Sequence, residues 1–188
     1  MPKRLSYILF LALALAAGQA SAFTLDLNLS DDAAEFKLAW HKQTGGEALL
    51  ETQVSWLHEQ DNGDLLGLGL HLVDNANPAG GRLDTGLGGR IIAIDTPGPD
   101  GVALAVGGYF RWTIPNMNRL GLGGELYVAP SIVSGGDLER HSQWALRGEY
   151  QVLRQANIYL GYRRVRPDFG GGSATFESGL HLGMRLNF

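Results

Sequence analysis

Apolar and polar residues alternate along most of the chain beyond Phe23, and clusters of Gly, Pro, Asn or Asp separate the alternating segments. In residues 176–188 the even-numbered positions are apolar except for Ser178, while the odd-numbered positions are polar, charged or glycine. Successive side chains of a strand point to opposite faces, so a period of two predicts strands with one apolar and one polar face. Because no window sustains the 3.6-residue period of an amphipathic helix, the sequence predicts an all-β protein.

Ten segments carry this pattern, and most reach the roughly nine to eleven residues that a tilted membrane strand needs. The first segment is short, so eight strands is the alternative count. The predicted strands are residues 23–29, 34–42, 48–58, 65–73, 83–94, 101–113, 120–129, 141–152, 157–165 and 176–188.

The direction of the apolar face separates two kinds of β protein. In a soluble sandwich or lipocalin-like barrel this face points inward, whereas in a membrane barrel it meets lipid. Glycine is frequent on the polar face, where it would make room for large neighbours inside a narrow barrel. Four tryptophans lie on the apolar face, two near each expected end, as in the aromatic girdle of a membrane barrel. They are Trp40, Trp56, Trp112 and Trp144. We therefore expect a closed antiparallel transmembrane β-barrel.

The charges on the polar face balance in sign. By alternation this face carries the acids Asp26, Glu35, Glu51, Glu125, Glu149 and Glu177 and the bases Lys37, Arg90, Arg111, Arg147, Arg163 and Arg185. Unpaired charge is costly in a closed lumen, so the balance predicts a neutralising charge network inside the barrel. We hypothesise that Glu125 and Arg147 approach each other, because one loop joins their strands.

The first twenty-two residues have the form of a secretory signal peptide. A positive start at residues 3–4 precedes an apolar run at 7–17, and Ala20-Ser21-Ala22 has the small-x-small form of a cleavage site. The run is shorter than the roughly 20 residues of a transmembrane helix. We expect cleavage between Ala22 and Phe23, which leaves residues 23–188 as the barrel. Losing two of 15 basic residues leaves 13 against 19 acidic ones, a net charge of −6.

Composition excludes several functions. The chain of 188 residues fits one domain, and its net charge of −4 gives no electrostatic footprint for nucleic acid. It contains no cysteine, which excludes disulfides, thiolate metal sites and a cysteine nucleophile.

The lengths of the connections suggest an orientation. Residues 114–119 and 153–156 form short connections, whereas 130–140 and 166–175 are longer. Membrane barrels have short periplasmic turns and longer outer loops, so we expect a periplasmic C-terminus. Residues 74–82 are long for a periplasmic turn and depart from this rule.

Five segments resemble the YfaZ family of small outer-membrane proteins. They are residues 64–70 (DLLGLGL), 102–108 (VALAVGG), 124–131 (GELYVAPS), 158–163 (IYLGYR) and 184–188 (MRLNF). Residues 124–131, followed by Gly135 and Gly136, are the most specific, and residues 74–99 match least. The resemblance spans most of the mature chain and implies a barrel in the bacterial outer membrane, with no catalytic motif to transfer. The terminal Phe188 looks like the signature by which outer-membrane barrels are recognised for assembly.

Catalytic and cofactor motifs are weak. His141 and Ser142 are strand neighbours that point to opposite faces, which excludes a Ser-His dyad. A protease would need acids such as Asp61, Asp64, Asp100 and Asp137 grouped with His58, but turn formation explains these residues more readily. The histidines at 41, 58, 71, 141 and 181 show no metal-ligand spacing. Residues 86–89 and 121–124 lie within strands, so they do not form a phosphate loop.

These observations predict a non-catalytic outer-membrane barrel with a narrow, charge-filled lumen and a structural or interaction role. A small channel for polar solutes is the alternative, and a lipid hydrolase or protease is a less favoured one. We expect no cofactor, no metal and no nucleic-acid partner. Outer-membrane lipid and the barrel assembly machinery are the expected partners.

Overall fold

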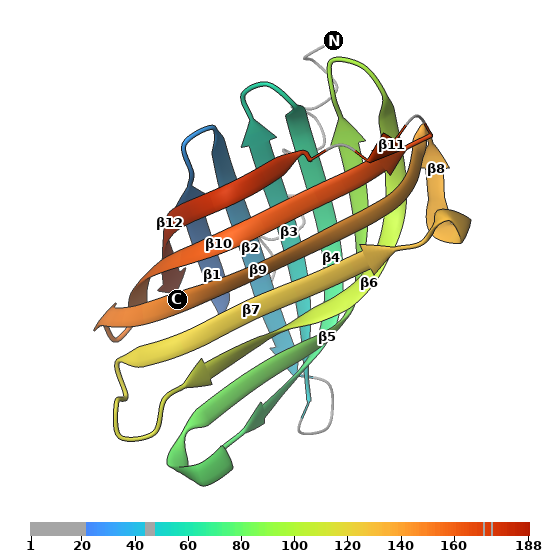
Figure 1. Cartoon of the computed structure of the whole chain (residues 1–188). Helices are drawn as coiled ribbons and strands as arrows, with labels where there is room; N and C mark the ends of the chain where they lie inside the picture. The colour runs from blue at the N-terminus through green and yellow to red at the C-terminus, as the bar shows by residue number, and fades with distance from the viewer. Residues whose placement is uncertain (1–21, 44–47, 171, 174) are drawn as a thin grey trace.

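The computed structural model describes residues 22–43, 48–170, 172–173 and 175–188, and within them ten long antiparallel strands form the wall of a barrel (Figure 1). The predicted signal peptide lies almost wholly outside the described residues. The long strands are β1 (Phe23–Leu29), β2 (Ala33–Gln43), β3 (Leu49–Glu59), β4 (Gly63–Ala76), β5 (Arg82–Asp95), β6 (Asp100–Thr113), β7 (Leu120–Ala129), β9 (Leu138–Leu153), β10 (Ala156–Phe169) and β12 (Glu177–Asn187).

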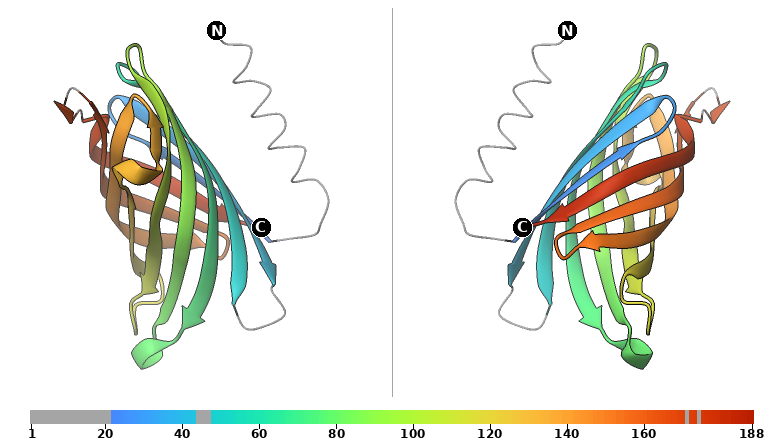
Figure 2. Two further views of the ribbon diagram at one scale, coloured as in Figure 1. Left: turned by 90° about the vertical axis from the view of Figure 1, so that its right-hand side faces the viewer. Right: turned by 90° about the vertical axis from the view of Figure 1, so that its left-hand side faces the viewer.

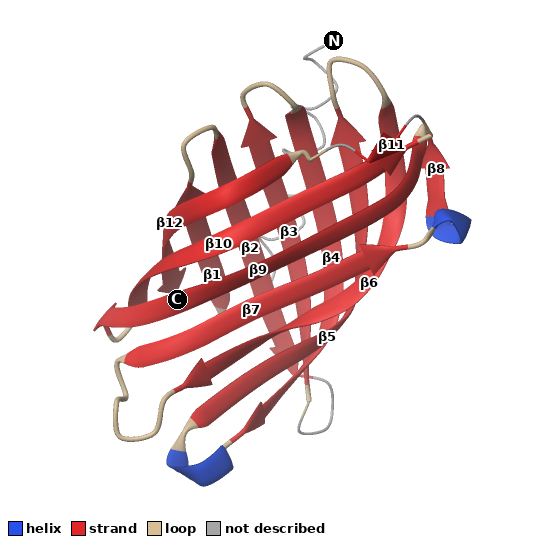
Figure 3. Cartoon of the chain, viewed as in Figure 1, coloured by secondary structure: helices blue, strands red, loops and turns tan. Residues whose placement is uncertain are grey.

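Four short elements complete the described chain. They are the single-turn 3-10 helices η1 (Pro78–Gly80) and η2 (Ser131–Val133) and the short strands β8 (Ser134–Gly136) and β11 (Gly172–Ser173), shown by type in Figure 3. Among the described residues, no helix has the length and apolar character to cross a membrane.

The first and last strands close the barrel. β1 pairs with β12 along its whole length, with Leu27 opposite Met184. The backbones of Phe23 and Phe188 exchange two hydrogen bonds of 3.2 and 2.9 Å, and their rings stack at 4.5 Å. The ring order is β1-β2-β3-β4-β5-β6-β7-β9-β10-β12. The short first segment is therefore a full member of the wall, and ten strands rather than eight is the correct count.

Two segments expected as loops belong partly to the wall. β6 pairs with β7 only over residues 106–113, and its residues 101–103 pair instead with β8. β8 thus closes a gap that the end of β7 leaves. β10 continues to Phe169 because β9 remains its partner there, although β12 begins only opposite Val165. Pro167 pairs with His141 on β9, and β11 pairs with the next two residues of β10 on the other side.

The connections only partly follow the expected asymmetry of lengths. All strands run between two ends of the barrel, and Phe23 and Phe188 lie at the same end, which we call the terminal end. At the opposite end, the connections at 30–32 and 60–62 are shorter than the connection at 77–81 on the terminal end. Figure 2 shows the hairpin with η1 extending farthest at the terminal end. Connection length alone was therefore a poor guide to orientation in the first half of the chain.

The wall is apolar outside and charged inside. Leu180 and Leu182 on β12 are 66% and 62% exposed, and similar apolar side chains cover the outer face of the other long strands. By contrast, Arg90, Arg163 and Arg185 are at most 2% exposed within the lumen. A soluble barrel would reverse this arrangement, so the outward apolar face fits a surrounding of lipid.

Candidate functional site in the barrel lumen

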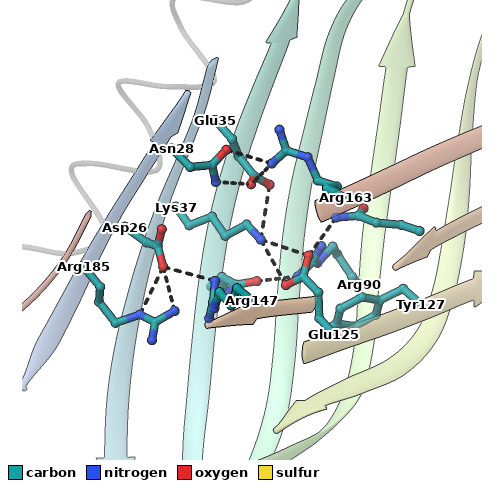
Figure 4. Close-up of polar contacts among 12 residues, drawn as sticks. Asp26, Asn28, Glu35, Lys37, Arg90, Glu125, Tyr127, Arg147, Arg163 and Arg185 are labelled. Atoms are coloured by element: carbon teal, nitrogen blue, oxygen red, sulfur yellow. Dashed lines mark hydrogen bonds and ion pairs between the residues drawn. The ribbon is translucent and has the colours of Figure 1, made fainter. Parts of the chain in front are cut away.

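Arg163 on β10 is the centre of a buried ion-pair cluster. Its guanidinium binds Glu177 on β12, with Nη2 2.7 Å from Oε1. It also forms a close ion pair with Glu35 on β2 (Figure 4). Asn28 on β1 accepts a bond of 3.0 Å from Arg163 and donates one of 2.7 Å to Glu35. The cluster therefore joins four consecutive strands of the ring across the closing seam.

Arg185 on β12 forms a second cluster nearer the terminal end. Its Nη2 lies 2.8 Å from Asp26 on β1, and its Nη1 lies 3.0 Å from Glu149 on β9. Arg147 also contacts both acids, at 3.6 Å from Asp26 and 2.8 Å from Glu149. The hydroxyl of Tyr159 donates a short hydrogen bond to Asp26. Two arginines thus neutralise two carboxylates in space that the wall shields from solvent.

Lys37 on β2 lies between acids from opposite sides of the lumen. Its Nζ is 3.3 Å from Glu35 and 3.0 Å from Glu125 on β7. The amide of Gln143 donates a further bond of 2.9 Å to Glu125. We hypothesised that Glu125 and Arg147 approach each other, and they do belong to the same charge network, but the described residues show no ion pair between them. The register sets Glu125 opposite Ala145, and Arg147 extends instead toward Glu149 and Asp26.

Glu51 on β3 is bound by neutral or weakly basic groups rather than by arginine. The ring nitrogens of His41 and His71 lie 2.9 and 3.2 Å from its carboxylate, and the Tyr109 hydroxyl donates a bond of 2.8 Å. The Tyr127 hydroxyl lies 2.9 Å from the other ring nitrogen of His71. Alternation did not predict this cluster, because it assigned Glu51 to the ion-pair network and gave the histidines no role.

Arg90 and Arg111 lie at the edges of the charge network. The guanidinium of Arg90 lies 4.0 Å from the centre of the Tyr127 ring and donates a bond of 2.6 Å to Gln53. Arg111 makes only a long ion-pair contact in the described part of the chain, with its Nε 3.8 Å from Glu149. The structure thus places every predicted charged residue inside the barrel, but only some of these residues form close ion pairs.

An apolar cluster, which we call the apolar plug, fills the lumen toward the end opposite the termini. The sequence predicted a charge-filled lumen and did not predict an apolar layer at this end. Its members are buried side chains from most of the strands. They are Ala33, Leu57, Leu65, Ile92, Ile94, Ala103, Ala105, Tyr127, Ala129, Leu138, Val165, Phe169 and Phe176.

Within the described residues, the lumen is open at the terminal end. A cavity of about 440 Å³, which we call the cup, is bounded by Tyr109, Arg111 and Glu149 toward the middle of the barrel and by residues such as Asn118 and Arg154 at the rim. Beyond it, among the ion pairs, a further void measures only about 50 Å³. The lumen therefore narrows from the cup through the charge network to the apolar plug.

Inward glycines make room for these side chains. A Cβ at Gly183 would lie 2.2 Å from the ring of Tyr159, and one at Gly67 would lie 2.4 Å from the Ser55 hydroxyl. Gly183 and Gly67 thus occupy positions where an inward neighbour already fills the space, whereas a Cβ at the inward Gly179 would meet nothing within 4 Å.

The four tryptophans lie on the outer face, two toward each end. Trp40 pairs with Phe23 and Trp112 with Leu83, near the terminal end. Trp56 and Trp144 lie toward the other end. Their place at the two membrane interfaces stays a prediction.

The structure does not assemble the enzymatic candidates. His141 is buried in the lumen, and Ser142 follows it on the outward face of β9. His58 and Asp64 lie 3.0 Å apart, but both are on the outer face, where the Trp56 indole also donates to Asp64 at 2.8 Å. In the described part of the chain, His, Asp and Glu form no group of three or more that could hold a metal ion.

Comparison with known proteins agrees with these features. A family model described as "YfaZ precursor" matches residues 3–188. The chain belongs to the YfaZ family. "Outer membrane protein YfaZ" of Escherichia coli (strain K12) is 31% identical over 137 residues, which cover 71% of this chain and 72% of that protein. The protein is thus an outer-membrane β-barrel protein, as its outward apolar face also indicates.

Solved structures of outer-membrane barrels are only distantly similar. A porin refined at 1.8 Å is 14% identical, with a TM-score of 0.33; the match covers 91% of this chain and 59% of the porin, so the chain spans well under two thirds of that protein. A loop-deletion mutant of OmpT of Vibrio cholerae is 9% identical, with a TM-score of 0.26 and coverage of 89% of this chain and 97% of that one. At these scores the description of the barrel rests on its own strand pairing.

Proposed function

We propose that this YfaZ-family member is a non-catalytic outer-membrane barrel whose lumen does not conduct solutes, and that it serves a structural or interaction role. The observation that carries the proposal is the succession of two obstructing layers along the lumen. Ion pairs such as Arg163 with Glu177 fill one layer, and apolar plug residues such as Leu57 and Ile92 fill the other. An ion would have to displace both layers, and an eight- to ten-stranded barrel is just wide enough for side chains to fill.

The proposal orients the cup toward the periplasm. An even number of strands places both ends of the barrel chain on one side, and the terminal end is periplasmic in barrels of this kind. The apolar outer face contacts outer-membrane lipid in this proposal, and Phe188 serves the barrel assembly machinery as a recognition signal. The outer end of the lumen is the end that the apolar plug closes.

Conductance across a planar bilayer tests the closed lumen. We expect the refolded protein to give no steady ion current at voltages where a 16-stranded porin, inserted in the same bilayer, conducts. A stable conductance from the wild type would overturn the proposal and favour the small channel. Phe176→Ala combined with Leu138→Ala removes bulk from the apolar plug, and we expect this variant to leak more than the wild type.

Enzyme assays test the non-catalytic part. The buried His141 and outward Ser142 cannot act together, so we expect no hydrolysis of phospholipid or peptide substrates above that of the His141→Ala variant. Hydrolysis that this change abolishes would contradict the proposal.

A further inference from the structure

The cup holds more positive charge than its acidic residues can neutralise. Among the described residues that line it, the acidic side chains are Asp84 and Glu149. Asp84 is bound by Arg82 at 2.8 Å, and Glu149 is bound by Arg185 and Arg147 at 3.0 and 2.8 Å. Both carboxylates are therefore already engaged.

Three further guanidinium groups border the same space. Arg111 lies toward its inner end, where its Nε is shielded from solvent and makes no hydrogen bond, with Glu149 at 3.8 Å. Arg119 and Arg154 stand at the rim, on the turns that precede β7 and β10. Within the described residues, no carboxylate lies within ion-pair distance of either rim arginine.

Neutral hydrogen-bonding groups supplement the arginines. Asn118, Gln151 and Asn157 also border the cup, and each carries an amide that can donate to an oxygen ligand. The volume of about 440 Å³ is within the usual range of roughly 300–1,000 Å³ for small-molecule sites. Guanidinium groups suit carboxylate and phosphate oxygens, with which they form paired hydrogen bonds.

We propose that the cup binds a small solute with two or more anionic oxygen groups, either phosphates or carboxylates, through Arg111, Arg119 and Arg154. The solute would enter from the terminal end and stop at the ion-pair layer. The inference goes beyond the proposed function and does not depend on a closed lumen, because a conducting barrel would keep the same cup. The conductance test of the closed lumen and the binding test of the cup can therefore give independent outcomes.

Titration calorimetry of the refolded mature protein in zwitterionic detergent tests the site. The probes are pyrophosphate and citrate, with sucrose as an uncharged control. We expect saturable binding of at least one anion at low salt, weaker binding at about 0.5 M salt, and none of sucrose. The anion that binds more tightly distinguishes phosphate from carboxylate recognition.

Substitutions locate the binding. Arg119→Gln combined with Arg154→Gln alters only turn residues, and we expect it to weaken binding about tenfold or more. Arg111→Gln should weaken it similarly, and the rim variant keeps the test valid if this change impairs folding. Lys42→Gln removes a charge from the same end but outside the cup, and it should leave affinity unchanged. No binding of either anion, or an equal loss in Lys42→Gln, would overturn the proposal.

Discussion

The Nζ of Lys37 lies 3.0 Å from both carboxylate oxygens of Glu125, and their strands, β2 and β7, are opposite each other in the ring of ten. One pair of side chains therefore spans the whole width of the lumen. Both side chains are nearly shielded, at 8% and 10% exposed. A water-filled channel through the barrel would have to pass this ion pair. The contribution of the Lys37–Glu125 pair to stability therefore reports on whether side chains or water fill the lumen.

Replacing Lys37 by Met should destabilise the barrel strongly. The change leaves Glu35 and Glu125 without their shared cation, and an unpaired buried charge costs about 3–5 kcal/mol. The free energy of unfolding in denaturant, measured in detergent or lipid, checks the value. Glu125→Gln in the same chain should recover part of the loss through a non-additive cycle.

Lys42→Met is the matched control for Lys37→Met. Lys42 is on the same strand but faces outward and is exposed, so its loss should change stability by less than about 0.5 kcal/mol. A small effect from Lys37→Met, close to that of the control, would mean that water screens the lumen charges. The channel would then be the better description.

Gly183 and Gly179 test how tightly the lumen is packed. Both lie on the inward face of β12, but a Cβ at Gly183 would meet the Tyr159 ring at 2.2 Å, whereas one at Gly179 would meet nothing within 4 Å. Overpacking typically costs about 1–3 kcal/mol, so we expect Gly183→Ala to lose that much stability. Gly179→Ala should be neutral or slightly stabilising. Equal effects would show that the Tyr159 ring yields without cost.

Alternation predicted the faces of the strands but not the partners across the lumen. Asp26 and Arg185 could be assigned inward from a period of two, yet their contact depends on closure of β1 on β12, 159 residues apart in sequence. We expected Glu125 and Arg147 to be partners because one loop joins their strands. The actual partner of Glu125 is Lys37, from the opposite wall, and no local pattern carries that information.

The apolar plug was missed for a different reason. Near the end opposite the termini, both faces of some strands are apolar, as in Ile91-Ile92-Ala93-Ile94, and alternation disappears there. Ile92 and Ile94 are almost completely buried, while Ile91 is 55% exposed. This continuous apolar run could have predicted the apolar plug. Such a strand needs an apolar interior on one face and lipid on the other.

Substitutions at Phe188 and Phe23 can distinguish a packing role of Phe188 from a role as the assembly signal. Their rings stack at 4.5 Å, so Phe188→Ser and Phe23→Ser remove the same contact, worth about 0.5–1.5 kcal/mol beyond the lost apolar area. We expect similar stability losses in the two refolded variants. In cells, only Phe188→Ser should lower the amount of barrel in the outer membrane if Phe188 is the assembly signal. Equal reductions in cells would reduce its role to packing.

The direction in which the cup faces can be tested with single cysteines, because the chain has none of its own. Gly98 lies on the exposed turn between β5 and β6 at the end opposite the termini, and Gln155 lies on the exposed turn between β9 and β10 at the terminal end. Residues 130–140 are less suitable for labelling, because β8 and the start of β9 belong to the wall.

A membrane-impermeant maleimide should label Gly98→Cys on intact cells, because that turn faces outside if the terminal end is periplasmic. Gln155→Cys should be labelled only after the outer membrane is permeabilised. Both variants should react equally in detergent, which controls for the reactivity of each thiol. Labelling of Gln155→Cys alone on intact cells would reverse the orientation. The cup would then open to the medium, and its anionic solute would have to come from outside the cell.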